Sequence, residues 1–297
     1  MTEGLAFGED AGTDTISGFE DVVAGGGDDE IAGNDGDNTL VGHGGDDLID
    51  GRAGDDVISG GHGNDQLCGD AGNDRILGGD GNDLIKGGDG DDLLLDGSGE
   101  DGVYGGAGDD RLVATSGPEN DIYNGGEGWD TLDYACTSTG VTIDLVAQIA
   151  FGVEIGDDAI FGFETVEGGA GNDHFVAGGE AMVLVGGDGL NIFEFTADDS
   201  AVAPGLVMHE ILDFKVGDRV RISKYDLFEQ VFDGLEDRFE NVYGEGIDED
   251  DIAIRYRNER TDEIDRTVIE ADFDQDEIYE TTITLLGNHV LVIVEHA

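Results

Sequence analysis

Apolar residues recur along this chain at a fixed spacing of nine positions. Between residues 42 and 113, the eighth residue of every nonamer is apolar, and the other positions are rich in glycine and acidic residues. The eighth-position residues are Ile49, Ile58, Leu67, Ile76, Ile85, Leu94, Val103 and Leu112. A short fixed period of this kind is typical of stacked-repeat proteins, in which neighbouring repeats bury a shared core. The pattern therefore predicts a stack of short strands.

The repeat array extends beyond this stretch on both sides. Residues 24–41 fit the same frame as two further nonamers, and residues 125–133 form another. Between them lies an irregular unit at 114–124, which is longer than a nonamer and contains Pro118. We expect this insertion to bulge out of the stack or to shift it slightly.

A second repeat block follows at residues 149–194. Residues 5–22 align without gaps with residues 149–166, and the shared residues include phenylalanines and a glutamate that do not belong to the nonamer. We interpret the two segments as a duplication, although any two nonapeptide segments match at multiples of nine. Met182 and Asn191 replace the sixth-position aspartate later in this block, so cation binding should fade there.

The composition changes after residue 194, where glycine becomes sparse. Alternating apolar residues predict strands, the last two of which would be joined by a tight turn at Gly287-Asn288. These strands are expected at 209–223, 252–257, 266–273, 281–286 and 289–294. Apolar residues at helical spacing predict one short helix at 227–243. Such a segment would cover the open end of the stack, where strand edges would otherwise be unpaired.

These boundaries predict three regions. The first is a repeat domain at 1–194, which comprises the main array at 24–133 and the second block at 149–194. A linker at 195–208 and a β-rich C-terminal cap at 209–297 follow.

The charge balance limits the partners. The 297 residues include 53 glycines, and 71 acidic against 13 basic residues give a formal net charge of −58. Without the strict period, such a composition would predict disorder. Because nucleic acids and anionic lipids are bound through lysine and arginine, we expect neither as a partner. The longest apolar run, at 290–294, is too short for membrane insertion. The two cysteines, Cys68 and Cys136, are expected to be free.

The polar positions of the repeat predict a cation site. In each nonamer the first six residues, G-G-x-G-x-D, have turn chemistry, and the last three suit a short strand. Glycines allow positive φ and close backbone approach, so that carbonyl oxygens converge beside the aspartate. Ligation by oxygen alone is selective for Ca²⁺, whereas zinc and copper prefer histidine and cysteine. The predicted metal ligands are Asp29, Asn38, Asp47, Asp56, Asp65, Asp74, Asp83, Asp92, Asp101, Asp110, Asp130 and Asp173. The acidic and amide residues at position five either add oxygens to these sites or solvate the turn.

The units resemble the GGxGxDxUx repeats of the RTX, or hemolysin-type calcium-binding, family over roughly residues 5–194. The resemblance implies an all-β fold, a right-handed parallel β-roll or β-solenoid, in which two nonamers complete one coil. Calcium ions would lie between turns stacked on the same side. One side would stack Asp29, Asp47, Asp65, Asp83 and Asp101, and the other Asn38, Asp56, Asp74, Asp92, Asp110 and Asp130. The offset between the two related segments, 149 − 5 = 144, would equal eight such coils, so both segments would face the same direction.

Charge repulsion makes the ion a condition of folding. Coils of a parallel stack repeat about every 4.8 Å, and two carboxylates ~5 Å apart repel by roughly 3 kcal/mol at an effective dielectric constant of ~20. Several such contacts outweigh the ~5–15 kcal/mol that stabilises a typical domain. We therefore expect the calcium-free array to be unfolded, with the free energy of binding supplying that of folding.

The resemblance also implies a route out of the cell. Chains of this family leave the calcium-poor cytosol unfolded through the type I secretion machinery, guided by an uncleaved C-terminal signal, and fold outside. We expect a secreted protein, with residues 291–297 in that signal. The first ten residues lack the features of a cleavable signal peptide.

Enzymatic motifs are missing from the sequence. His209-Glu210 does not begin an HExxH helix, and no G-x-S-x-G segment occurs. We therefore favour a non-enzymatic, calcium-folded extracellular protein with a structural, surface-associated or adhesive role. Two alternatives are an enzyme whose site uses residues 134–167 or the tail, and a module that stabilises and exports a larger enzyme. The sequence does not predict an oligomeric state.

Overall fold

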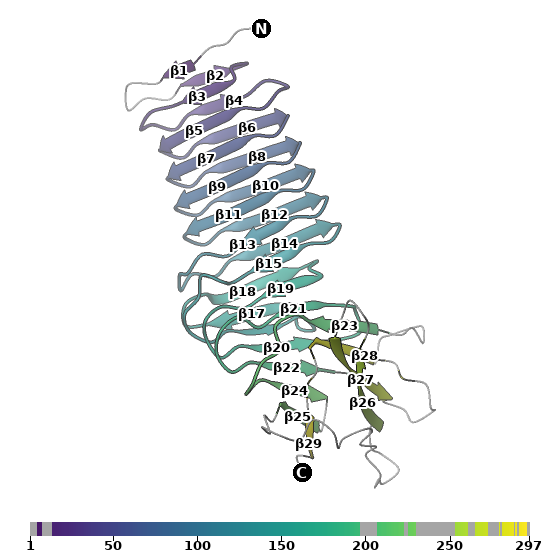
Figure 1. Ribbon diagram of the computed structural model, residues 1–297. Coiled ribbons are helices and arrows are strands. Elements are labelled where there is room, and N and C mark those ends of the chain that lie inside the picture. The colour runs from purple at the N-terminus through teal and green to yellow at the C-terminus, as the bar shows by residue number, and fades with distance from the viewer. Residues whose placement is uncertain are drawn as a thin grey trace. The chain divides into compact units, whose positions relative to one another are not determined.

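The computed structural model describes residues 5–7, 14–196, 207–222, 225–229, 253–260, 265–272, 279, 281–287, 289 and 291–295. The chain divides into two compact units. The first comprises residues 1–138 and 148–165, and the second comprises residues 139–147 and 166–297. Every regular element among the described residues is a strand (Figure 1).

The first unit consists of short strands that alternate between two sheets (Figure 1). One sheet has the order β1 (Leu5–Phe7), β3 (Asp21–Val23), β5 (Thr39–Gly44), β7 (Val57–His62), β9 (Arg75–Asp80), β11 (Leu93–Ser98), β13 (Arg111–Val113) and β15 (Thr131–Asp133). The other has the order β2 (Thr15–Ser17), β4 (Glu30–Ala32), β6 (Leu48–Ala53), β8 (Gln66–Ala71), β10 (Leu84–Asp89), β12 (Gly102–Ala107), β14 (Ile122–Glu127), β18 (Gly156–Phe161) and β17 (Ile149–Gly152).

The strand register confirms that two nonamers complete one coil. Ile49 pairs with Leu67, and Leu67 pairs with Ile85, so each strand lies beside the strand that starts two nonamers later and runs parallel to it. The eighth-position residues are at most 2% exposed and form the core of the unit. The predicted all-β solenoid is therefore correct.

The strands are longer than predicted. From β5 to β12, each strand has six residues and runs from position seven of one nonamer to position three of the next. The expectation of a six-residue turn is wrong, because the first three residues of the repeat lie in a strand, where the second and third pair with the next coil, as Gly88 does with Gly106 and Asp89 with Ala107. Only positions four to six form the turn.

Neighbouring coils approach so closely that two positions of the repeat favour glycine. At the second position, Gly61 has φ +122°, and a Cβ there would lie 2.2 Å from the carbonyl oxygen of His43. At the fourth position, Gly63 has φ +126°, and its Cβ would lie 2.0 Å from the carbonyl oxygen of Gly45. Left-handed backbone costs other residues roughly 1–2 kcal/mol. Three second-position residues adopt it nonetheless, with φ of 77°, 83° and 73°: His43, Arg52 and Asp70.

The irregular unit lengthens a coil without ending the stack. Gly102 pairs with Ile122, and Ile122 pairs with Ala159, so both steps are longer than the two nonamers of a regular coil. Thr15 and Ala159 have the same offset as the two related segments, yet seven strand-to-strand steps of unequal length separate them. The prediction of eight equal coils is wrong, although β2 and β18 do lie in the same sheet.

The two related segments also differ in their pairing. β1 runs parallel to β3, with Leu5 opposite Asp21, whereas β17 runs antiparallel to β18, with Ile149 opposite Ala159. Only residues 153–155 connect β17 to β18, and a connection of this length favours a hairpin. The aligned sequences therefore do not fold alike throughout.

The second unit contains parallel strands followed by antiparallel ones. One sheet has the order β19 (Thr165–Glu167, of which 166–167 belong to this unit), β21 (Val183–Val185), β23 (Val207–Ile211), β28 (Thr281–Leu286), β27 (Asp265–Asp272) and β26 (Ala253–Arg260). The other has the order β16 (Thr142–Asp144), β20 (His174–Ala177), β22 (Ile192–Phe195), β24 (Arg219–Ile222), β25 (Tyr225–Glu229) and β29 (Leu291–Glu295). Stacked aromatic rings enter this core, with the ring centroids of Phe175 and Phe193 5.1 Å apart.

The C-terminal segment contributes strands to both sheets of the second unit. β28 pairs with β23 and β27, whereas β29 pairs with β25. The last two strands, which were predicted to be joined by a tight turn at Gly287-Asn288, therefore lie in different sheets. Asn288 lies outside the described residues. The start of the predicted helix at 227–243 is wrong, because Leu227 and Phe228 belong to strand β25. Residues 230–243 of that helix and residues 197–206 of the predicted linker lie outside the described residues.

Candidate metal centre

The sixth-position side chains stack in two columns, which we call the aspartate ladders. After the first member of each ladder, each Oδ1 accepts a hydrogen bond from the main-chain N–H of the sixth-position residue one coil earlier, as between Asp47 N and Asp65 Oδ1 at 2.8 Å. The first ladder contains Asp29, Asp47, Asp65, Asp83 and Asp101. The second contains Asn38, Asp56, Asp74, Asp92, Asp110 and Asp130. The structure therefore brings the predicted residues together in the predicted order.

Two members of the first ladder were missed by the sequence analysis. Asp121 Oδ1 accepts from Asp101 N at 2.7 Å, and Asp158 Oδ1 accepts from Asp121 N at 3.0 Å. Both residues lie outside the regular nonamer frame. The local order of a polar residue, aspartate, any residue and an apolar residue, as in 120–123 and 157–160, would have identified them.

A shorter column occurs in the second unit. Asp173 Oδ1 accepts from Val141 N at 2.9 Å, and Asn191 Oδ1 accepts from Asp173 N at 2.9 Å. Asp218, which was not predicted, accepts from Asn191 N at 2.8 Å. The carboxylates of the main array thus give way here to one amide.

The second carboxylate oxygen along the ladders has no partner. In ten aspartates the Oδ2 atom is buried and makes no hydrogen bond: Asp47, Asp56, Asp65, Asp74, Asp83, Asp92, Asp101, Asp110, Asp130 and Asp173. Asp29 differs, because its Oδ2 accepts from Gly25 N at 3.2 Å. Leaving a buried polar atom without a partner costs roughly 1–3 kcal/mol, and more when the group is charged. A row of such atoms fits the binding of cations.

Except at Asp101, whose repeat begins with Asp96, each unpartnered oxygen lies close to the first glycine of its own repeat. A Cβ on Gly60 would lie 2.2 Å from Asp65 Oδ2 and 2.8 Å from the carbonyl oxygen of Gly78, one coil later. A carboxylate and a main-chain carbonyl therefore approach the same point. No three His, Cys, Asp or Glu side chains in the described part of the chain converge as a metal-binding group. A cation would accordingly take its further ligands from carbonyl oxygens, which suits Ca²⁺.

Burial and mutual repulsion raise the pKa values along the ladders. Desolvation is the largest cause, neighbouring carboxylates add to it, and the accepted N–H bonds oppose it. The pKa is raised to about 7 for Asp83, Asp92, Asp101 and Asp110. It is raised to about 6 for Asp47, Asp56, Asp130 and Asp173. Without a cation, the folded ladders therefore resist ionisation.

The position-five side chains also bond to neighbouring turns, but in the direction opposite to that of the aspartate ladders. Asn64 N donates to Asp46 Oδ1 at 2.8 Å, and Asn82 N donates to Asn64 Oδ1 at 2.8 Å. These side chains are exposed, and each accepts from the following coil, whereas the aspartate ladders accept from the preceding one. Their observed role is to cap main-chain N–H groups, which neither of the two expected roles included.

Tyrosine hydroxyls contact a second set of buried carboxyl groups, which includes Asp121 and Asp158 of the first ladder. Asp96 occupies a first position, where most repeats have glycine, and its Oδ2 accepts from the hydroxyl of Tyr123, which also lies 3.2 Å from Asp121 Oδ2. The hydroxyl of Tyr134 donates to Asp158 Oδ2 at 2.9 Å. Burial raises the pKa of Asp96 and raises the pKa of Asp158 to about 7. These groups can share or hold protons, and their oxygens are satisfied by tyrosine.

Histidine and cysteine stand apart from the ladders. His62 Nδ1 lies 2.7 Å from Asp80 Oδ2 with both side chains largely exposed. Cys68 and Cys136 are free, as expected. The atoms that approach one another at the first glycine of a repeat are oxygens of a carboxylate and of a main-chain carbonyl.

Comparisons with known proteins agree with this geometry. A model of the RTX calcium-binding nonapeptide repeat matches residues 10–49, 23–58, 41–76, 77–112 and 158–193. These ranges contain the ladder residues from Asp29 to Asp110 and also contain Asp173. A search of curated proteins found no significant match. Within the described residues, no helix has the length and apolar character needed to cross a membrane.

Proposed function

The chain carries RTX calcium-binding nonapeptide repeats, which bind several Ca²⁺ ions and form a β-roll, and we propose that its aspartate ladders hold those ions. The ligands are the predicted sixth-position residues and main-chain carbonyls such as that of Gly78. Bound calcium supplies positive charge between stacked carboxylates. The observation that carries this proposal is the row of buried Oδ2 atoms without hydrogen-bond partners.

Calcium binding and folding are one process in this proposal. The accepted N–H bonds place each carboxylate within one coil of the next, where repulsion opposes the fold. An ion between stacked turns removes that repulsion, so its binding free energy becomes folding free energy. The repeat domain at 1–194 responds to calcium, and the strands of 209–297 close it beyond the linker at 195–208.

The setting that suits this chemistry is outside the cell. RTX repeat proteins are typically secreted, which supports export of an unfolded chain through the type I machinery and folding in calcium-rich surroundings. Residues 291–297 belong to the export signal in this proposal. The β-solenoid of these repeats is a structural calcium-binding fold, which supports a structural, surface-associated or adhesive role.

Circular dichroism of the full chain tests the calcium proposal. Addition of millimolar Ca²⁺ to the calcium-free chain should produce β structure, EGTA should reverse it, and Mg²⁺ should not replace it, because Mg²⁺ retains its water ligands more strongly. Asp65→Asn should raise the calcium concentration at the midpoint, whereas Asp46→Asn, an exposed position-five change, should shift it less. An equal response to Mg²⁺, or a chain already folded in EGTA, would refute the proposal.

A further inference from the structure

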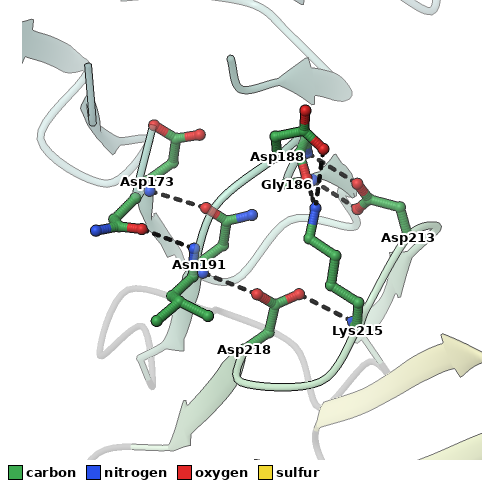
Figure 2. Close-up of polar contacts among 10 residues, drawn as sticks. Asp173, Gly186, Asp188, Asn191, Asp213, Lys215 and Asp218 are labelled. Atoms are coloured by element: carbon green, nitrogen blue, oxygen red, sulfur yellow. Dashed lines mark hydrogen bonds and ion pairs between the residues drawn. The ribbon is translucent and has the colours of Figure 1, made fainter. Parts of the chain in front are cut away.

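The last stacked turn of the second unit contains a lysine (Figure 2). Residues 213–218 stack on residues 186–191, because Asn191 N donates to Asp218 Oδ1 at 2.8 Å, the same contact that joins successive members of the aspartate ladders. Asp218 therefore occupies the sixth position of this turn, and Lys215 occupies the third.

The ammonium group of Lys215 points back into the preceding turn. Its Nζ donates to the carbonyl oxygen of Gly187 and lies 3.8 Å from Asp188 Oδ1 (Figure 2). The ammonium thus brings one positive charge to a carboxylate and a carbonyl oxygen of the preceding turn.

The sixth-position residue of the preceding turn is Asn191 instead of an aspartate, so a negative charge is missing beside the lysine. Asn191 Nδ2 lies 2.5 Å from the place of a Cβ on Gly186, whereas in the main array the same place above Gly60 holds Asp65 Oδ2 at 2.2 Å. An amide donor therefore replaces a carboxylate acceptor. At the sixth position of this turn pair one carboxylate is replaced by an amide, and Lys215 adds a positive charge, while Asp213 places a carboxylate where most repeats have glycine.

Two carboxylates in the turn at 213–218 accept hydrogen bonds from main-chain N–H groups of this turn pair. Asp213 accepts from Gly186 N at 2.7 Å and from Gly187 N at 2.8 Å. Asp218 Oδ2 accepts from Lys215 N at 2.9 Å. These bonds satisfy both oxygens of each carboxylate, in contrast to the unpartnered Oδ2 atoms of the main array.

We propose that Lys215 is a built-in cation, whose ammonium takes the place of a calcium ion between residues 186–191 and residues 213–218. The comparison with calcium rests on the proposed function of the aspartate ladders. The last turn pair then closes without an ion, while the turn pairs of the main array require one.

Hydrogen exchange of the full chain in EGTA tests the local effect. The amides of 186–191 and 213–218 should be protected in the wild type, and Lys215→Met should lose that protection. Lys215→Arg, which keeps the charge, should retain it, and Lys86→Met on an exposed strand face is the matched control. Equal protection in Lys215→Met and Lys86→Met, or an unprotected wild-type turn, would overturn the proposal.

Counting bound ions by equilibrium dialysis against ⁴⁵Ca²⁺ tests whether Lys215 replaces a calcium ion or only packs against the preceding turn. The double variant Asn191→Asp with Lys215→Ala should bind one more calcium ion than the wild type, whereas Asn191→Asp alone should bind no additional ion. A double variant that binds no extra ion, while the wild type binds several, would overturn the role of Lys215. A wild type that binds none would instead refute the proposed function, and hydrogen exchange would still report on the turn.

Discussion

The turns of the main array and the turn at 213–218 of the second unit use the same main-chain contact, but only the latter contains a lysine. In both, a sixth-position side chain accepts an N–H bond from the coil before it, as Asp83 and Asp218 do. In the main array the second oxygen is buried and unpartnered, whereas Asp218 uses its second oxygen on Lys215 N. The difference separates the stacking contact, which both regions make, from the unpartnered oxygens of the main array, to which we assign the requirement for an ion.

Removal of calcium should have the largest effect, and it should separate the two regions. Trypsin in EGTA should cut first after Arg52, Arg75 and Lys86 in the main array, because repulsion opens those coils. Cleavage after Lys215 should be slower, and calcium should protect the array. Initial cleavage after Lys215, seen by mass spectrometry of the fragments, would contradict the comparison.

Substitution of a fourth-position glycine should destabilise the calcium-loaded array strongly. In Gly63→Ala the Cβ would meet the carbonyl oxygen of Gly45 at 2.0 Å, and φ is +126°. Strain and overpacking together should lower the free energy of unfolding by about 2–5 kcal/mol. In the control Gly102→Ala the nearest atom is Tyr104 Cε2 at 3.3 Å, and the change should stay within about 1 kcal/mol. Chemical denaturation in saturating calcium compares the two, and equal losses would show that the turn is not closely packed.

Acid should partly replace calcium in the main array. In the calcium-free fold, burial and repulsion raise the pKa of Asp83 and Asp92 from 3.8 to about 7. The folded state then binds more protons than the unfolded state, so its stability is greatest below the unfolded pKa and is lost as pH rises through the folded pKa. Circular dichroism in chelator should show more β structure near pH 4 than above pH 7. The opposite trend would mean that the carboxylates are not buried together.

The smallest effect should come from relieving strain at a second position. Arg52 has φ 83°, and Arg52→Gly should raise the free energy of unfolding by about 1 kcal/mol, because glycine adopts this backbone without a steric penalty. Arg75→Gly, at a strand position without positive φ, should instead lower it by roughly 0.5–1 kcal/mol. Thermal unfolding with calcium measures both variants, and a loss of stability in Arg52→Gly would show that its side chain matters more than its backbone.

The strict period predicted much of the fold, because one spacing determines both burial and stacking. The eighth-position core, the coil of two nonamers and the members of both aspartate ladders were predicted. Asp121 and Asp158 were not, because the longer coils place them outside the frame. The antiparallel pairing of β17 depends on a short connection rather than on the repeat. The role of Lys215 could not be predicted, because the sequence does not show that residues 213–218 stack on residues 186–191.

Side chains at positions five and six bond to neighbouring coils in opposite directions, and this determines how such a chain can change length. Position-six residues are fastened to the coil before them and position-five residues to the coil after them. Excision of one whole coil, such as 66–83, would bring together equivalent partners on both columns. Excision of a single nonamer would exchange the two sides and mismatch the flanking strands. The array is therefore a modular scaffold that can grow or shrink by whole coils, with each junction already fitted to its neighbour.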